Sequence, residues 1–234
     1  MCVVCFRGGL GRRGMLLGGA GLLMTALSRG PVRAQPVRAA ETPDEALKLL
    51  VEGNARYAAN QPNERDFSSS RASRAGGQAP FAAILGCADS RVAPELAFDR
   101  SPGDLFVVRT AGNYVTTDGL ASLEYGAAVL GTKVIMVLGH SNCGAINATV
   151  QALKTRNNFP GHIADMVRAI KPAIEAELGK PGDDVAQRAV ITNVRHNVRR
   201  LQQAKPILSV MVAKGQLRVV GGVYDLATGK ITAI

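Results

Sequence analysis

The chain has 234 residues, of which 47% are hydrophobic, 4% are aromatic and none is tryptophan, so it is long enough for one globular domain built from small apolar side chains. Its net charge of +10 does not indicate a nucleic-acid partner, because six of the 28 basic residues lie in the first 40 positions, which contain no acidic residue. The remainder carries 22 bases against 18 acids. No basic run with interleaved aromatic residues follows, and we expect no binding to nucleic acid.

The chain begins with the pattern of an export signal. Arg12 and Arg13 stand directly before an apolar stretch that runs to Leu27. This stretch is too short and too rich in glycine for a stable membrane span, and it resembles a twin-arginine signal peptide. Two small-residue cleavage sites end at Ala34 and Ala39, and both remain open. We expect export to the periplasm; an uncleaved membrane anchor or a wrongly assigned start is the alternative.

The expected leader, residues 1–40, contains two of the four cysteines. The mature domain, residues 41–234, then has no membrane attachment and keeps Cys87 and Cys143. Two cysteines can form one disulfide in an oxidising compartment. Both lie beside other metal-type ligands, however, and a bound metal would keep them as thiolates.

The mature domain opens with a helix signal. Thr42, Pro43 and Glu45 provide an N-cap threonine, a proline at the first helical position and a glutamate three residues after the cap. This capping box predicts a helix that reaches about Ala59. Residues 61–78 are polar and lack apolar periodicity, which predicts a linker or an irregular arm.

Strands and helices then alternate along the chain. Short apolar runs predict buried strands at residues 81–85, 105–108, 134–138 and 217–220. Helices are predicted at residues 119–130, 145–154, 163–178 and 185–203. The last helix is expected to face the core with Ile191, Val194, Val198 and Leu201. The alternation predicts an α/β fold, a mainly parallel β-sheet flanked by α-helices.

Two short motifs follow the first and third predicted strands. Cys87 and Asp89 belong to the first motif, and His140 and Cys143 belong to the second. Functional sites of parallel sheets lie beyond the carboxyl ends of the strands, where such motifs meet. Two thiolates and an imidazole fill three positions of a tetrahedral zinc site and leave the fourth for water. Sulfur and nitrogen ligands favour zinc over magnesium or calcium, although iron and cobalt remain open.

These motifs read C-A-D-S-R and H-S-N-C-G, and the chain also contains R-T-A-G-N at 109–113, S-L-E-Y-G at 122–126 and G-V-Y-D at 222–225. With them the mature chain closely resembles the β-class carbonic anhydrases over nearly its whole length. The resemblance implies the β-carbonic anhydrase fold and reversible, zinc-dependent hydration of carbon dioxide to bicarbonate through a zinc-bound hydroxide. It also implies one Zn²⁺ per chain, held by Cys87, His140 and Cys143.

The same resemblance assigns catalytic roles to Asp89 and Arg91. Arg91 would hold the Asp89 carboxylate away from the metal, where that carboxylate accepts the proton of the nucleophile and orients it. In some family members the aspartate instead binds zinc as a fourth ligand and closes the site. Asp89 therefore has two expected roles, and a plain structural ion pair is the alternative for Arg91.

A substrate pocket is also implied, formed by Gln78, Phe106 and Tyr125 together with Gly144 of the second motif. Gln78 would donate to a substrate oxygen, and the two aromatic rings would surround an apolar gas. For Phe106 alone, core packing is an equal alternative. Family members assemble as homodimers or homotetramers, in which Gln78 and Tyr125 would act across subunits. Ile84 replaces the tryptophan of allosterically regulated members, which argues against their bicarbonate switch.

Two other functions remain open. A hydrolase for carbonyl sulfide or carbon disulfide would use the same ligands, and only pocket shape or a direct assay separates it from an anhydrase. A noncatalytic, zinc-stabilised interaction module is less consistent with the sequence, because a structural metal site does not require Asp89 and Arg91.

Overall fold

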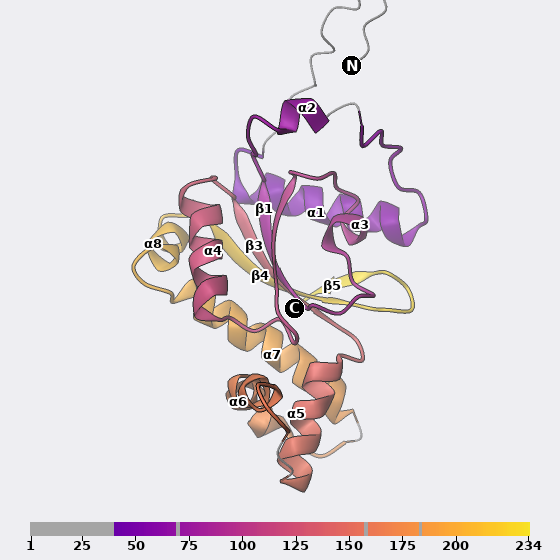
Figure 1. The fold of residues 1–234 in the computed structure, drawn as a ribbon, viewed down its shortest axis with the longest axis vertical. Helices are drawn as coiled ribbons and strands as arrows, with labels where there is room; N and C mark the ends of the chain where they lie inside the picture. The colour runs from indigo at the N-terminus through magenta and orange to yellow at the C-terminus, as the bar shows by residue number, and fades with distance from the viewer. Residues whose placement is uncertain (1–39, 69–70, 157–158, 183) are drawn as a thin grey trace, which may run out of the picture. The chain divides into compact units, whose positions relative to one another are not determined.

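The computed structural model describes residues 40–68, 71–156, 159–182 and 184–234 (Figure 1). Helix α1, Pro43–Ala58, begins at the predicted capping box. The Oγ1 atom of Thr42 accepts a hydrogen bond from the Glu45 N–H, and the Glu45 carboxylate accepts one from the Thr42 N–H. The expected leader lies outside the described residues except for Ala40. Of the helices that are described, none has the length and hydropathy needed to cross a membrane.

One five-stranded sheet forms the centre of the domain, in the order β2-β1-β3-β4-β5. The strands are β1, Ala82–Gly86; β2, Leu105–Arg109; β3, Val134–His140; β4, Arg218–Tyr224; and β5, Ile231–Ala233. The first four are parallel, and β5 runs antiparallel to β4. The four predicted strands and the mainly parallel α/β fold are thus confirmed. Strand β5 was not predicted, because three residues are too few for a periodic signal.

Both faces of the sheet are covered by helices (Figure 1). On one face, Ala83 and Leu85 of β1 pack in an apolar cluster with residues of helices α4, Thr117–Ala128, and α7, Val185–Gln202. On the other face, Ala82 and Ile84 pack with residues of α1 and of α3, Pro94–Ala97. Because every residue of β1 is buried, the strand is apolar throughout.

Helices α5, Gly144–Thr155, and α6, Ile163–Ile174, pack on each other and on α7. The helix predicted at 163–178 is shorter than expected, because the chain tightens into a 3₁₀ turn, Glu175–Glu177, directly after α6. Three short helices were not predicted. They are α2, Arg71–Arg74, within the polar arm, α3, and α8, Leu208–Ala213.

Candidate metal centre

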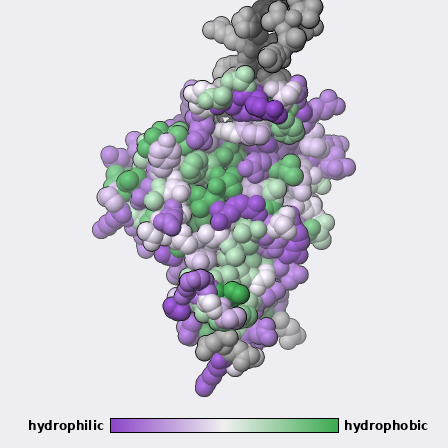
Figure 2. All heavy atoms as spheres, in the orientation of Figure 1, coloured by the Kyte–Doolittle hydropathy of each residue, from purple (hydrophilic) through white to green (hydrophobic). Residues whose placement is uncertain are grey.

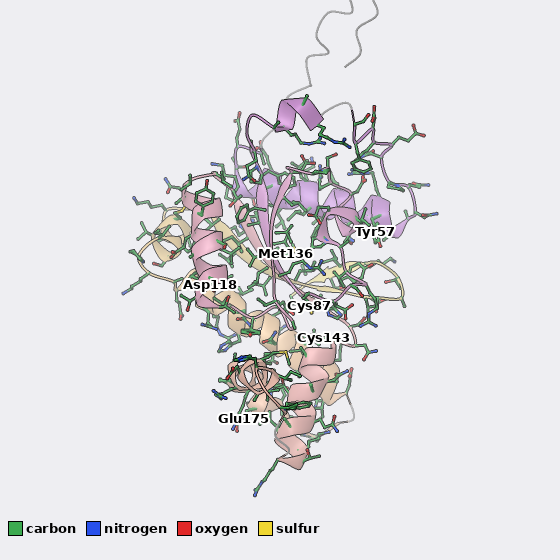
Figure 3. All side chains as sticks on the ribbon, viewed as in Figure 1. Tyr57, Cys87, Asp118, Met136, Cys143 and Glu175 are labelled. Atoms are coloured by element: carbon green, nitrogen blue, oxygen red, sulfur yellow. The ribbon has the colours of Figure 1, made fainter. Side chains whose placement is uncertain are left out.

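The two predicted ligand motifs meet at the carboxyl ends of neighbouring strands. Cys87 directly follows β1, and His140 is the last residue of β3. Strands β1 and β3 pair in parallel with Gly86 opposite Leu138, so their ends lie side by side. Cys143 is the N-cap residue of α5, and Figure 3 shows it close to Cys87 at the end of that helix.

The ligand atoms of Cys87, His140 and Cys143 all lie within 4.8 Å of one another. The two Sγ atoms are 3.9 Å apart, and all three residues are buried. No other group of three or more His, Cys, Asp or Glu residues in the part of the chain that the structure describes is arranged to hold a metal. The predicted ligands therefore converge as the sequence indicated.

The imidazole of His140 is oriented as a metal ligand requires. Its Nδ1 atom lies 2.9 Å from the Ser141 carbonyl oxygen, a contact that places the proton on Nδ1 and leaves a lone pair on Nε2. The buried Nε2 atom has no hydrogen-bond partner among the described residues. A buried nitrogen without a partner is uncommon. Together with the two neighbouring sulfur atoms, this nitrogen forms a ligand set suited to Zn²⁺.

The hydrogen bond between the two cysteines shifts their pKa values in opposite directions. The pKa of Cys87 is lowered to about 4, first by the contact with Cys143 and then by contacts with His140 and backbone N–H groups, against the opposing effect of burial. The same contact and burial raise the pKa of Cys143. For His140, burial disfavours the charged form, but the neighbouring Cys87 outweighs it and raises the pKa. The lowered pKa favours the thiolate form of Cys87, which is the form that binds metal.

Asp89 and Arg91 stand at the rim of this cluster. The Arg91 Nε and Nη2 atoms donate to the two Asp89 carboxylate oxygens at 2.9 and 2.7 Å. These hydrogen bonds hold the pKa of Asp89 well below its usual range. Asp89 Oδ2 also lies 3.7 Å from Nε2 of His140. The structure therefore places an ionised carboxylate beside the ligand atoms, oriented by an arginine.

Arg109 was not predicted as a site residue, although it begins one of the family segments. It ends β2, opposite Gly86 in the sheet register. Its guanidinium donates to the carbonyl oxygens of Cys87, Asp89 and Val92 at 2.7 to 2.9 Å. One side chain thus fixes the backbone of the loop that carries the first ligand and the carboxylate.

Three of the four expected pocket residues do not lie at this centre. Phe106 of β2 is opposite Ala83, four residues before Cys87 and therefore about 13 Å from it along the strand. Tyr125 of α4 is half exposed, and its ring centroid is 6.3 Å from that of Phe106. Figure 2 shows apolar residues gathered on the surface beside α4.

Gln78 is exposed and precedes the amino end of β1, whereas Cys87 follows the carboxyl end. The structure therefore does not bring Gln78 to the metal ligands of its own chain. Gly144 is the exception among the pocket residues. It directly follows Cys143 as the first residue of α5, and a Cβ atom added there would meet no other atom within 4 Å.

Comparison with known proteins agrees with this geometry. The family model for carbonic anhydrase matches residues 82–231. Carbonic anhydrase 2 of Mycobacterium tuberculosis is 40% identical over 194 residues, which cover 80% of this chain and 91% of that protein.

Solved structures of β-carbonic anhydrases share the fold. The enzyme from Coccomyxa, solved in complex with acetazolamide, superposes with a TM-score of 0.63 at 33% identity and covers 80% of this chain and 86% of its own. Tetrameric β-carbonic anhydrases from Sordaria macrospora give a TM-score of 0.63 at 27% identity, covering 77% of this chain and 90% of theirs. With the ligand cluster and the Asp89–Arg91 pair in place, the chain belongs to the β class of the carbonic anhydrase family.

Proposed function

We propose that the protein is a zinc-dependent carbonic anhydrase that interconverts carbon dioxide and bicarbonate with one Zn²⁺ per chain. One observation carries this proposal: the buried Nε2 atom of His140 faces the sulfur atoms of Cys87 and Cys143, and an ionised carboxylate lies 3.7 Å from it. A structural zinc site has four protein ligands, whereas three protein ligands that leave the fourth position to water are typical of a catalytic site.

Zinc, when bound, would supply a Lewis acid that makes water nucleophilic near neutral pH. Residues around the metal site would position the attacking water and the ligands. Asp89 is ionised because Arg91 binds both of its oxygens, so it is able to accept a hydrogen bond from the attacking water and direct a lone pair toward carbon dioxide. Arg109 keeps the backbone of Asp89 in place. The Ser141 carbonyl fixes the ring of His140.

Asp89 is proposed to have a second role as a conditional fourth ligand. The pairing with Arg91 supports a site in which the fourth position stays accessible to water. Rotation of the carboxylate away from Arg91 would move Oδ2 toward the ligands and close this position. The expected signature is activity that appears only at alkaline pH, with unchanged metal content.

The protein is also proposed to work as a homodimer or homotetramer. Gln78 lies at the opposite end of β1 from Cys87, and Phe106, within β2, and Tyr125, within α4, lie away from the ligands. This separation supports completion of the substrate pocket by a second copy of the chain. Sedimentation equilibrium of the purified protein tests the assembly, and a monomer with full activity would contradict it.

Residues 1–40 are proposed to export the folded, metal-loaded protein to the periplasm. The paired arginines and the following apolar stretch support this assignment. Expression of the full chain in a bacterium with twin-arginine export should give a shortened periplasmic product. Replacement of both arginines, Arg12→Lys with Arg13→Lys, should leave the chain in the cytoplasm, and export unaffected by this change would contradict the proposal.

Stopped-flow carbon dioxide hydration tests the central proposal, using residues 41–234, which lie within one compact unit. Zinc is quantified on the same sample between about pH 6.5 and 9. Rapid hydration with one zinc per chain, lost on chelation, is the expected result. Full zinc content without hydration at any pH would contradict the proposal and favour linear sulfur-containing substrates, which the same preparation is then assayed against.

A further inference from the structure

Helix α7 carries two buried asparagines on its core-facing side. Asn193 and Asn197 are each 1% exposed and lie one helical turn apart. Their neighbours Val194 and Leu201 are fully buried apolar side chains. Burying an amide is unfavourable unless its polar atoms are hydrogen-bonded. Hydrogen-bond partners are therefore needed to offset the burial of these two amides.

Both amides bind the segment that connects β2 with α4. Asn193 Nδ2 donates to the Gly112 carbonyl oxygen at 2.9 Å, and Asn197 Oδ1 accepts from the Val115 N–H at 2.9 Å. Asn197 Nδ2 also donates to Asn193 Oδ1 at 3.1 Å, which orients the first amide. Near the end of the helix, Arg200 donates to the Val115 carbonyl oxygen. Three α7 side chains thus hold one connecting segment.

The connecting segment has a conformation that needs such support. Gly112 has φ +86° and Asn113 has φ +41°, so two consecutive residues lie in the left-handed region. Backbone of this kind persists when surrounding contacts fix it. A Cβ atom on Gly112 would lie 2.6 Å from Ile170 Cδ1, which explains the glycine.

The same segment contacts a metal ligand. The Gly112 N–H donates to Cys87 Sγ at 3.2 Å, while the Gly112 carbonyl oxygen accepts from Asn193. We infer that Asn193 and Asn197 are positioning residues for the Cys87 thiolate, acting by fixing the Gly112 backbone so that its N–H stays on the sulfur. This inference rests on the proposed metal site. An N–H donor to a ligand sulfur orients the ligand and tunes its electron donation to the metal.

Cobalt substitution provides a readout that a purely structural role would not change. The full-length protein is loaded with Co²⁺ as wild type and with Asn193→Leu, which removes the donor at similar volume. Asn193→Ser is a milder variant, because its hydroxyl is able to bond to the helix carbonyl four residues earlier. Val198→Ala is the matched control, since Val198 packs against the core from the same helix and no hydrogen bond joins its side chain to the connecting segment. The sulfur-to-cobalt charge-transfer absorption and the affinity for Co²⁺ against a chelator are measured.

Both Asn193 variants are expected to shift the charge-transfer band and to lose about 10- to 100-fold in metal affinity. With zinc, kcat should fall while KM changes little. Asn197→Leu should give the same shifts to a smaller extent, and Val198→Ala should lower the unfolding temperature without moving the band.

The inference would be overturned by a folded Asn193→Ser protein whose charge-transfer band and Co²⁺ affinity equal those of the Val198→Ala control. This test remains decisive if Asn193→Leu does not fold. Failure of the wild-type protein to bind Co²⁺ or zinc, or to hydrate carbon dioxide, would instead contradict the proposed function.

Discussion

The Arg91 guanidinium engages both carboxylate oxygens of Asp89, through Nε at 2.9 Å and Nη2 at 2.7 Å. The backbone N–H of Arg91 adds a third hydrogen bond to Oδ1 at 3.0 Å. One arginine thus fixes the position, the orientation and the ionised state of a carboxylate beside the candidate ligands. This relationship makes the role of Asp89 testable apart from metal binding.

Asp89→Ala should leave zinc content nearly unchanged and reduce carbon dioxide hydration by about 10²- to 10⁴-fold, because the hydrogen-bond acceptor for the nucleophile is lost while the three ligands remain. Stopped-flow kinetics and metal analysis on one preparation check both parts. Unchanged turnover would remove Asp89 from the mechanism. Loss of zinc together with activity would show instead that the carboxylate supports the metal.

Arg109→Lys should reduce hydration by about 10- to 100-fold even though the charge is kept. A lysine ammonium has no planar fork and cannot reproduce the contacts with the carbonyl oxygens of Cys87, Asp89 and Val92. The kinetics are compared with those of Arg195→Lys, a change at an exposed position on α7. Equal activity of the two variants would contradict a supporting role for Arg109.

Metal removal should make the two ligand cysteines sensitive to oxidation. Their Sγ atoms are 3.9 Å apart, and no disulfide forms between them in the structure. Treatment of the metal-free mature domain with diamide should join them, with a mass loss of about 2 Da as the two thiols are oxidised and diamide is reduced. The zinc-loaded domain should resist, and Cys143→Ser should give no intramolecular bond. Equal oxidation of loaded and metal-free protein would contradict zinc binding by these thiolates.

Asp99 should make a part of the folding stability dependent on pH. Its buried carboxylate binds Arg56 at 2.6 Å and Arg65 at 2.5 Å, and although burial alone would raise its pKa, these partners lower it. A carboxyl group with a lowered folded-state pKa stabilises the fold above its unfolded pKa of about 3.9 and loses this contribution as pH falls further.

Asp99→Ala should therefore cost about 1 to 3 kcal/mol near pH 7, because two partly exposed arginines lose their carboxylate partner. The cost should shrink as pH falls below about 4, because the carboxyl of the unfolded chain takes up a proton there, and the folded carboxyl follows at lower pH. Urea denaturation near pH 7 and below about pH 4 measures the free energy of unfolding of the wild type and the variant. Glu52→Ala, on the exposed side of α1, serves as the control. A cost independent of pH would show that packing rather than charge makes Asp99 important.

Local sequence determined much of this protein. The capping box at Thr42 fixed the start of α1, because its hydrogen bonds join residues three apart. Continuous apolar runs gave the four parallel strands, since a strand buried on both faces has no polar side. Chemical type and the position after a strand identified Cys87, His140 and Cys143, because parallel strands bring their carboxyl ends to one edge.

Only the tertiary structure decided which distant groups meet. The β1–β3 register places Cys87 near His140, and the β1–β2 register places Phe106 away from both. Asn193 reaches the connecting segment across 81 sequence positions. Such contacts depend on strand order, crossovers and helix packing over the whole domain. They cannot be predicted from the local periodicity of the sequence. The sequence therefore identified the candidate ligands, whereas the fold decided how the surrounding residues hold them.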